Sequence, residues 1–213
     1  MPDYRLHCFA QSGNAYKVAL ALELAAQDWE PVYVDFFNGA ARTAEYLAIN
    51  EMGEVPVLEH AGLKLSQSGM ILDYLSKVLG RFEPETEEER REILRWTLWD
   101  NHKLTSNIAT LRFMLNFIPP EKRKEDVIGF LHGRVESAMN VLERHLEGRD
   151  WIAGPHITTA DLSCIGYLYY TDEFGVEMSE FPNIDRWRQT IAALPRWKHP
   201  YELMPGHPLP QKA

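Results

Sequence analysis

The sequence has few cysteines, fewer basic than acidic residues, and no long apolar run. Its two cysteines, Cys8 and Cys164, lie far apart in the 213 residues and form neither a C-x-x-C pair nor a cluster with the spacing of metal ligands. We therefore expect neither a structural disulfide nor a zinc site. Cys8 lies within an apolar run and is interpreted as a buried structural thiol.

The excess of acidic over basic residues limits the classes of molecule that the protein can bind. Lys and Arg number 22 against 31 Asp and Glu, a formal net charge of −9, which argues against binding to phosphate backbones or anionic membranes but leaves room for a local anion site. There is no run of about 18 apolar residues to span a bilayer, and residues 1–5 lack the basic and apolar blocks of a signal peptide. We expect a cytoplasmic protein with no nucleic-acid and no membrane partner.

The first eighty residues alternate between strand and helix signals. A short apolar run at 6–9 leads through a polar turn at 11–17 into a helical stretch at 18–24. Residues 29–36 alternate in polarity and are rich in β-branched and aromatic side chains. The order predicts a β-α-β unit.

The polar turn between the first strand and the first helix is a candidate anion site. Gly13 permits an unusual backbone angle, Ser12 and Asn14 offer hydrogen-bond donors, and the N–H groups of the helix start add positive potential. Such a corner suits an anion, including a thiolate. The alternative is that Ser12 or Asn14 only caps the helix.

Residues 54–60 and 63–66 form two apolar runs around a short turn, which predicts an antiparallel hairpin. Pro56 cannot donate to a strand ladder, so it needs an edge or a bend. Either Pro56 simply starts the strand, or the Val55 backbone is left to pair with a peptide-like ligand. The following helix has Ser68 as its expected N-cap, and its N-terminus offers a second site of carboxylate size.

The remainder of the chain reads as helical. Thr86 and Glu89 form a capping box ahead of a long helix that should end at Pro119-Pro120, and 122–147 carry the spacing of a second long helix. Thr158 and Asp161 repeat the capping-box pattern, so Asp161 is interpreted as structural and not as a catalytic base. The tail 204–213 is rich in proline and polar residues, and we expect a surface strap or a disordered end.

Three segments together resemble the thioredoxin-like half of a cytosolic glutathione transferase: Ser12 to Val18, Gly53 to Leu58 and Gln67 to Leu75. Segments 157–162 and 181–187 are similar to the helical half of the same family. The resemblance implies an α/β domain at 1–80, a thioredoxin-like βαβ-ββα unit that binds glutathione. It implies an all-α substrate-binding domain at 86–213.

The resemblance also implies roles for single residues. Val55-Pro56 would be a cis peptide whose flanking backbone pairs with the cysteinyl part of glutathione, while Gln67 and Ser68 would hold its γ-glutamyl end. Glu54 is counted with them as a glutathione-binding residue. In serine-type members a hydroxyl at the position of Ser12 donates to the thiolate, and in another bacterial branch an asparagine stands at the position of Asn14. We expect Ser12 to be the main donor, with Asn14 as co-donor or substitute.

This chain departs from the family pattern at two points. Several relatives carry Lys or Arg where this chain has Glu54, so the glycyl carboxylate of glutathione needs another cation, either Arg42 or Lys17. Most relatives have glutamate where this chain has the neutral Gln67, which should weaken the attraction for the α-amino group. Tyr4, near the tyrosine of tyrosine-type members, is placed before the first strand and has a weaker claim as donor.

The predicted activity is conjugation of the glutathione thiolate to a hydrophobic electrophile, with glutathione as cosubstrate and no metal. The first loop lacks a cysteine, so exchange by a C-x-x-C dithiol is not available. Alternatives are glutathione-dependent reduction of a peroxide or disulfide, and a non-catalytic binding protein of the same fold.

The family resemblance also implies a homodimer. Four residues of the long helix are open to assignment as substrate pocket, core or dimer contact: Trp99, Lys103, Asn107 and Phe113.

Overall fold

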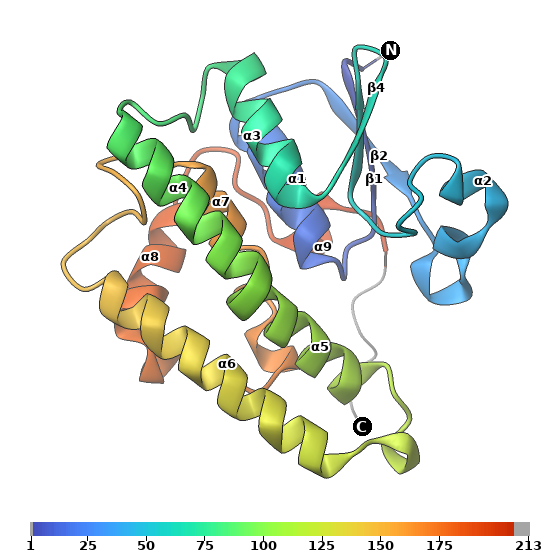
Figure 1. Cartoon of the computed structure of the whole chain (residues 1–213), viewed down its shortest axis with the longest axis vertical. Coiled ribbons are helices and arrows are strands. Elements are labelled where there is room, and N and C mark those ends of the chain that lie inside the picture. Colours follow the sequence, from blue (N-terminus) through green and yellow to red (C-terminus); the bar gives the residue numbers. More distant parts are fainter. Residues whose placement is uncertain (1, 207–213) are drawn as a thin grey trace. The chain divides into compact units, whose positions relative to one another are not determined.

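A mixed four-stranded sheet organises the first part of the chain (Figure 1). The computed structural model describes residues 2–206. The strands are β1 (Tyr4–Cys8), β2 (Trp29–Tyr33), β3 (Val57–His60) and β4 (Leu63–Ser66), in the spatial order β2-β1-β3-β4. β1 is parallel to β2 and antiparallel to β3, and β3 is antiparallel to β4. The predicted β-α-β unit and hairpin are confirmed, and the sheet is that of a thioredoxin-like domain.

Two helices and a group of short turns complete this unit. α1 (Gly13–Leu24) and α3 (Ser68–Leu79) pack against each other. The connection from β2 to β3 contains the 3₁₀ turns η1 (Phe36–Asn38) and η2 (Ala40–Arg42) and the short helix α2 (Ala44–Leu47). Apolar side chains of sheet and helices form a core from which water is excluded, among them Leu6, Leu20, Leu58 and Leu75.

Strand register brings three loops to one end of the sheet. His7 lies opposite Val57, and Val57 lies opposite Ser66. Because β1 and β4 both run antiparallel to β3, the carboxyl ends of β1 and β4 meet the amino end of β3. The loops that follow Cys8, precede Val57 and follow Ser66 therefore emerge together.

The second unit, Phe82 to Ala193, is helical. Its long helix consists of α4 (Glu87–Trp99), a π-helical turn η3 (Asp100–Leu104) and α5 (Thr105–Asn116), and it ends before Pro119. The turn η4 (Pro120–Lys122) leads to α6 (Glu125–His145), which runs beside α5. Then follow α7 (Thr159–Cys164), the turns η5 (Thr171–Glu173) and η6 (Met178–Glu180), and α8 (Pro182–Ala192).

Asp161 has the structural role that its capping box predicted. It is fully buried, and its carboxylate accepts from the Thr158 amide at 2.8 Å, the Ile152 amide at 2.9 Å and the Trp187 indole at 3.0 Å. Burial raises the pKa of this carboxyl, while the hydrogen bonds act in the opposite direction. The carboxylate joins the start of α7 to α8 and to the loop before α7.

The π-helical turn coincides with a second buried carboxylate. Asp100 accepts from the hydroxyls of Thr105 and Ser163, each at 2.7 Å. The bond to Ser163 ties the long helix to α7. Such π-turns commonly mark places where a helix is deformed to place a side chain.

The described residues from Leu194 onward pack with the first unit, not with the second. Tyr16 of α1 donates to the Lys198 carbonyl at 2.9 Å, and the Ala10 amide donates to the Pro205 carbonyl at 2.7 Å. This segment contains α9 (Pro200–Leu203). The division into domains 1–80 and 86–213 stays a prediction, and residues 207–213 of the predicted tail lie outside the described residues.

No helix within residues 2–206 is long and apolar enough to cross a membrane.

Candidate functional site

Ser12 lies at the junction of β1 and α1 and caps the helix. Its Oγ accepts from the Ala15 amide at 3.2 Å, and its own amide donates to the Phe9 carbonyl at 3.0 Å. The side chain is buried, with 6% exposed. Because Oγ acts as acceptor toward Ala15, its hydrogen is available for donation to another group. Capping and donation to a thiolate are therefore compatible.

Asn14, in the first turn of α1, is joined to the start of α3. The Ser68 hydroxyl donates to Asn14 Oδ1 at 3.3 Å. No hydrogen bond joins the Asn14 amide nitrogen to another residue in the described part of the chain, so its N–H groups remain to serve as donors. The two helix N-termini are thus held side by side.

The expectation that Ser68 caps α3 is wrong. The N-cap is Gln67, which has φ +69° and makes no side-chain capping bond, while Ser68 is the first helical residue. Its hydroxyl is used for Asn14 instead. A positive φ is costly for a side chain of this kind, and such residues concentrate at binding sites.

The Val55-Pro56 peptide is cis, as the family resemblance implied. Pro56 precedes β3, and the backbone N–H and C=O of Val55 make no hydrogen bond to any residue between 2 and 206. The residue before Pro56 therefore presents a free donor and a free acceptor close to the start of β3. A peptide backbone can pair with such an edge.

Two residues that the sequence did not single out hold this segment. Tyr46 donates its hydroxyl to the Glu54 carbonyl at 2.9 Å, and Asn50 donates its amide to the same carbonyl at 2.8 Å. Both are buried, and burial raises the pKa of Tyr46 to about 12, so it is a stable donor. Neither residue lies in a segment that the sequence pattern singled out, so nothing local in the chain pointed to this role.

The side chains of Glu54 and Gln67 meet across the site. Gln67 Nε2 donates to Glu54 Oε2 at 3.1 Å and contacts Met52 Sδ at 3.0 Å. Both are exposed. The carboxylate of Glu54 therefore lies beside the neutral amide of Gln67.

The two cations considered for the glycyl carboxylate, Arg42 and Lys17, differ in exposure. Arg42 is exposed at the end of η2, and its Nη1 lies 3.0 Å from where a Cβ on Gly53 would be. Gly53 has φ +62° and directly precedes Glu54, so a side chain there would be strained, and its Cβ would lie 2.9 Å from the Ala41 carbonyl oxygen. Lys17, by contrast, is 0% exposed within α1.

Tyr4 lies in β1, not before it, and occupies the end of the strand that is farther from Ser12. It pairs with His60 in the sheet and stacks on its ring at 4.1 Å between centroids. Ser12 follows the opposite end of the same strand, roughly 13 Å further along an extended chain of this length. Cys8 is buried as predicted, and burial raises the pKa of its thiol to about 12, so it supplies no reactive thiolate.

Three of the four long-helix candidates line a cavity inside the second unit. Trp99, Lys103 and Asn107 face residues of α6 around a space of about 190 Å³. Phe113 is 44% exposed and is not among the lining residues. The cavity is therefore formed by two helices of one unit.

The site as a whole offers hydrogen-bond donors, two helix starts and the exposed cation Arg42. Within residues 2–206, no group of three or more His, Cys, Asp or Glu side chains is arranged to hold a metal ion. The arrangement suits a peptide that carries carboxylates and a thiol, since free thiols are mostly protonated at neutral pH and need donors to become thiolates.

Comparison with known proteins agrees with this geometry. Residues 3–77 match the family model "Glutathione S-transferase, N-terminal domain", and residues 105–195 match "Glutathione S-transferase, C-terminal domain". A crystal structure of a glutathione S-transferase from Pseudomonas fluorescens is 32% identical, with a TM-score of 0.86 over 93% of this chain and 99% of that one.

Two curated proteins of Escherichia coli K12 are similar over most of their length. Disulfide-bond oxidoreductase YfcG is 25% identical over 88% of this chain and 89% of its own. Glutathione S-transferase GstB is 27% identical over 86% of this chain and 90% of its own length. Both family domains, in their usual order, and a relative above 30% identity establish that this chain belongs to the glutathione S-transferase family.

Proposed function

We propose that this protein binds glutathione in its first unit, lowers the pKa of the thiol, and transfers the thiolate to a hydrophobic electrophile. The observation that carries the proposal is the hydrogen bond between Asn14 and Ser68, which joins two helix starts, together with the unpaired backbone of Val55. The loops that hold these residues emerge at the same end of the sheet.

The proposed glutathione pose uses the predicted residues. The cysteinyl backbone pairs with Val55, the γ-glutamyl end lies at Gln67 and Ser68, and the glycyl carboxylate binds Arg42. Glu54 accepts from Gln67 and keeps that amide oriented. Because Glu54 also adds negative charge near two carboxylates of the ligand, we expect modest affinity.

Ser12 is the proposed main thiolate donor and Asn14 the second. Both can donate without giving up a hydrogen bond of the described structure. The potential at the start of α1 adds to this effect. In the reaction the sulfur lone pair forms a C–S bond to the electrophile, and the electron pair of the broken bond leaves with the leaving group.

The second candidate activity is glutathione-dependent reduction of a disulfide or peroxide. The similarity to a protein named disulfide-bond oxidoreductase favours it. Two glutathione molecules would supply the two electrons and leave as glutathione disulfide, with the products being two thiols from a disulfide or an alcohol and water from a peroxide, because the buried Cys8 and Cys164 offer no accessible thiol. A non-catalytic role would require that bound glutathione keep an unshifted thiol pKa.

We also propose a homodimer. Leu94 and Leu98 are 55% and 63% exposed and lie one turn apart on α4, so they form an apolar strip that a second copy can cover. The cytoplasmic location stays a prediction.

The test is a titration of the purified protein with reduced glutathione, with the thiolate absorbance followed as pH is varied. We expect saturable binding and a thiol pKa below that of free glutathione. The same preparation is then assayed with 1-chloro-2,4-dinitrobenzene, cumene hydroperoxide and 2-hydroxyethyl disulfide, which separates conjugation from the two reductions. Binding without a pKa shift, and no turnover of any of the three, would refute the enzyme proposal in favour of a binding protein.

A further inference from the structure

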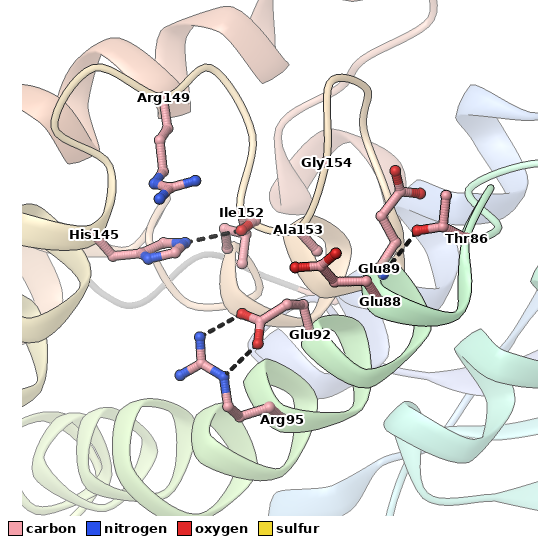
Figure 2. A pocket seen from close by; sticks show the side chains of 10 residues that line it. All are labelled: Thr86, Glu88, Glu89, Glu92, Arg95, His145, Arg149, Ile152, Ala153 and Gly154. Carbon is pink, nitrogen blue, oxygen red and sulfur yellow. Dashed lines mark hydrogen bonds and ion pairs between the residues drawn. The ribbon is translucent and has the colours of Figure 1, made fainter.

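A cavity of about 540 Å³ lies within the second unit and contains none of the residues assigned to glutathione. It is formed by the start of α4, the end of α6 and the loop that leads toward α7 (Figure 2). Its lining residues are Thr86, Glu88, Glu89, Glu92, Arg95, His145, Arg149, Ile152, Ala153 and Gly154. The volume lies in the range of small-molecule sites.

The floor and part of the walls are fixed by hydrogen bonds. Arg95 donates to both carboxylate oxygens of Glu92. Glu89 accepts from the Glu85 amide at 2.7 Å, which replaces the reciprocal bond to Thr86 expected of a full capping box. Each of these two carboxylates already has a partner, so neither needs a ligand.

The His145 ring is equally constrained. It packs on Trp96 at 4.2 Å between centroids, and its Nε2 bonds to the Ile152 carbonyl at 2.8 Å. Burial lowers the pKa of His145, followed in the same direction by the charges of Arg149 and Arg95. Both effects favour the neutral ring, so His145 is not counted among the cations of the cavity.

Two charged side chains of the lining have no such partner. The Arg149 guanidinium and the Glu88 carboxylate form no hydrogen bond or ion pair with any other residue that the structure describes. Figure 2 shows Arg149 with His145 on one side of the cavity, and Glu88 with Glu89 on the other. The cavity thus has one uncommitted cation and one uncommitted anion on opposite sides.

The charge arrangement selects the class of ligand. A simple anion that approached Arg149 would also meet the carboxylates of Glu88, Glu89 and Glu92. A simple cation at Glu88 would meet Arg149 and Arg95. We infer that the cavity binds a small zwitterion, a free amino acid or short peptide, with its carboxylate on Arg149 and its ammonium group on Glu88.

The test uses triglycine, which carries both terminal charges and no side chain. Backbone amide shifts of the ¹⁵N-labelled full-length protein are followed during titration, and we expect saturating shifts at Ala153 and Gly154. Two matched peptides each lack one charge: N-acetyl-triglycine and triglycine amide. Both should bind at least tenfold more weakly. Shifts confined to Val55 and Ser68 would report the glutathione site and would overturn the inference.

Substitutions complete the test. Arg149→Ala and Glu88→Gln should each abolish the saturating shifts at Ala153 and Gly154. Arg144→Ala and Glu147→Gln are controls, because both residues are exposed near the end of α6 and neither lines the cavity, so binding should not change. Circular dichroism checks that all four variants fold. Equal binding of a blocked peptide, or equal binding by Arg149→Ala, would contradict the inference. The outcome of this titration does not depend on the proposed glutathione chemistry.

Discussion

Asn14 and Ser68 are 54 residues apart in the sequence and are joined by a hydrogen bond between their side chains, Ser68 Oγ to Asn14 Oδ1 at 3.3 Å. The bond links the N-termini of α1 and α3. It also orients the Asn14 amide so that its nitrogen is the end left for donation. The relationship ties the proposed γ-glutamyl site to the proposed thiolate site.

Replacing Ser68 should weaken glutathione binding and leave the fold intact. In Ser68→Ala we expect the dissociation constant for glutathione to rise by about tenfold or more, since a hydrogen bond to a charged ligand group is lost. Calorimetric titration measures this. Ser66→Ala, the same change two residues earlier in β4, is the control. An unchanged affinity in Ser68→Ala would remove Ser68 from the site.

The two roles of Ser12 can be separated by substitution. Ser12→Ala loses both the helix cap and the donor, so we expect a loss of stability of about 1 kcal/mol and a fall in kcat/KM of roughly 10²-fold. Ser12→Asp keeps an acceptor for the Ala15 amide but places a negative charge beside the sulfur. It should retain stability and still raise the thiol pKa. Full activity in Ser12→Asp would exclude Ser12 as donor.

Asp161 should matter for stability and not for chemistry. Asp161→Asn places amide hydrogens against the donors of Thr158, Ile152 or Trp187, and we expect roughly 3 kcal/mol less stability, as for other broken buried networks. Denaturant unfolding gives the value. Asp172→Asn is the control, because Asp172 is exposed. If the unfolding midpoint of Asp161→Asn matched that of the control, the network would carry no stability.

His145 should make stability depend on pH. Its pKa is lowered in the folded state, mainly by burial, so the unfolded chain binds the proton more readily. The stabilising contribution is complete above the unfolded pKa of about 6.5 and is lost as pH falls from there through the folded value. Unfolding curves between pH 5 and 7.5 should show this decline in the wild-type protein and less of it in His145→Gln. If the free energy of unfolding fell equally with pH in the wild-type protein and in His145→Gln, groups other than His145 would cause the decline.

The apolar strip on α4 should control assembly. Leu94→Glu with Leu98→Glu places two charges where a second copy would pack, and we expect multi-angle light scattering to report monomers in place of dimers. Arg91→Glu alters an exposed position of the same helix and should leave the dimer intact. A wild-type protein that is monomeric at all concentrations tested would contradict the proposal.

The sequence by itself determined the elements and their order. Alternation and helical spacing predicted the strands, the hairpin and the long helices, and the capping pattern at Thr158 and Asp161 identified a structural carboxylate, because such signals depend on neighbours within a few residues. The resemblance of three short segments placed Ser12, the cis Val55-Pro56 peptide and Gln67 in one family pattern.

Only the tertiary structure decided which side chains meet. Sheet register placed Tyr4 at the end opposite Ser12, and packing in α1 buried Lys17, whereas Arg42, the other candidate cation, is exposed. The same packing gave Ser68 a partner in Asn14 and brought Tyr46 and Asn50 to the carbonyl of Glu54. These contacts depend on how separate elements pack in three dimensions, and no local spacing in the chain encodes that arrangement.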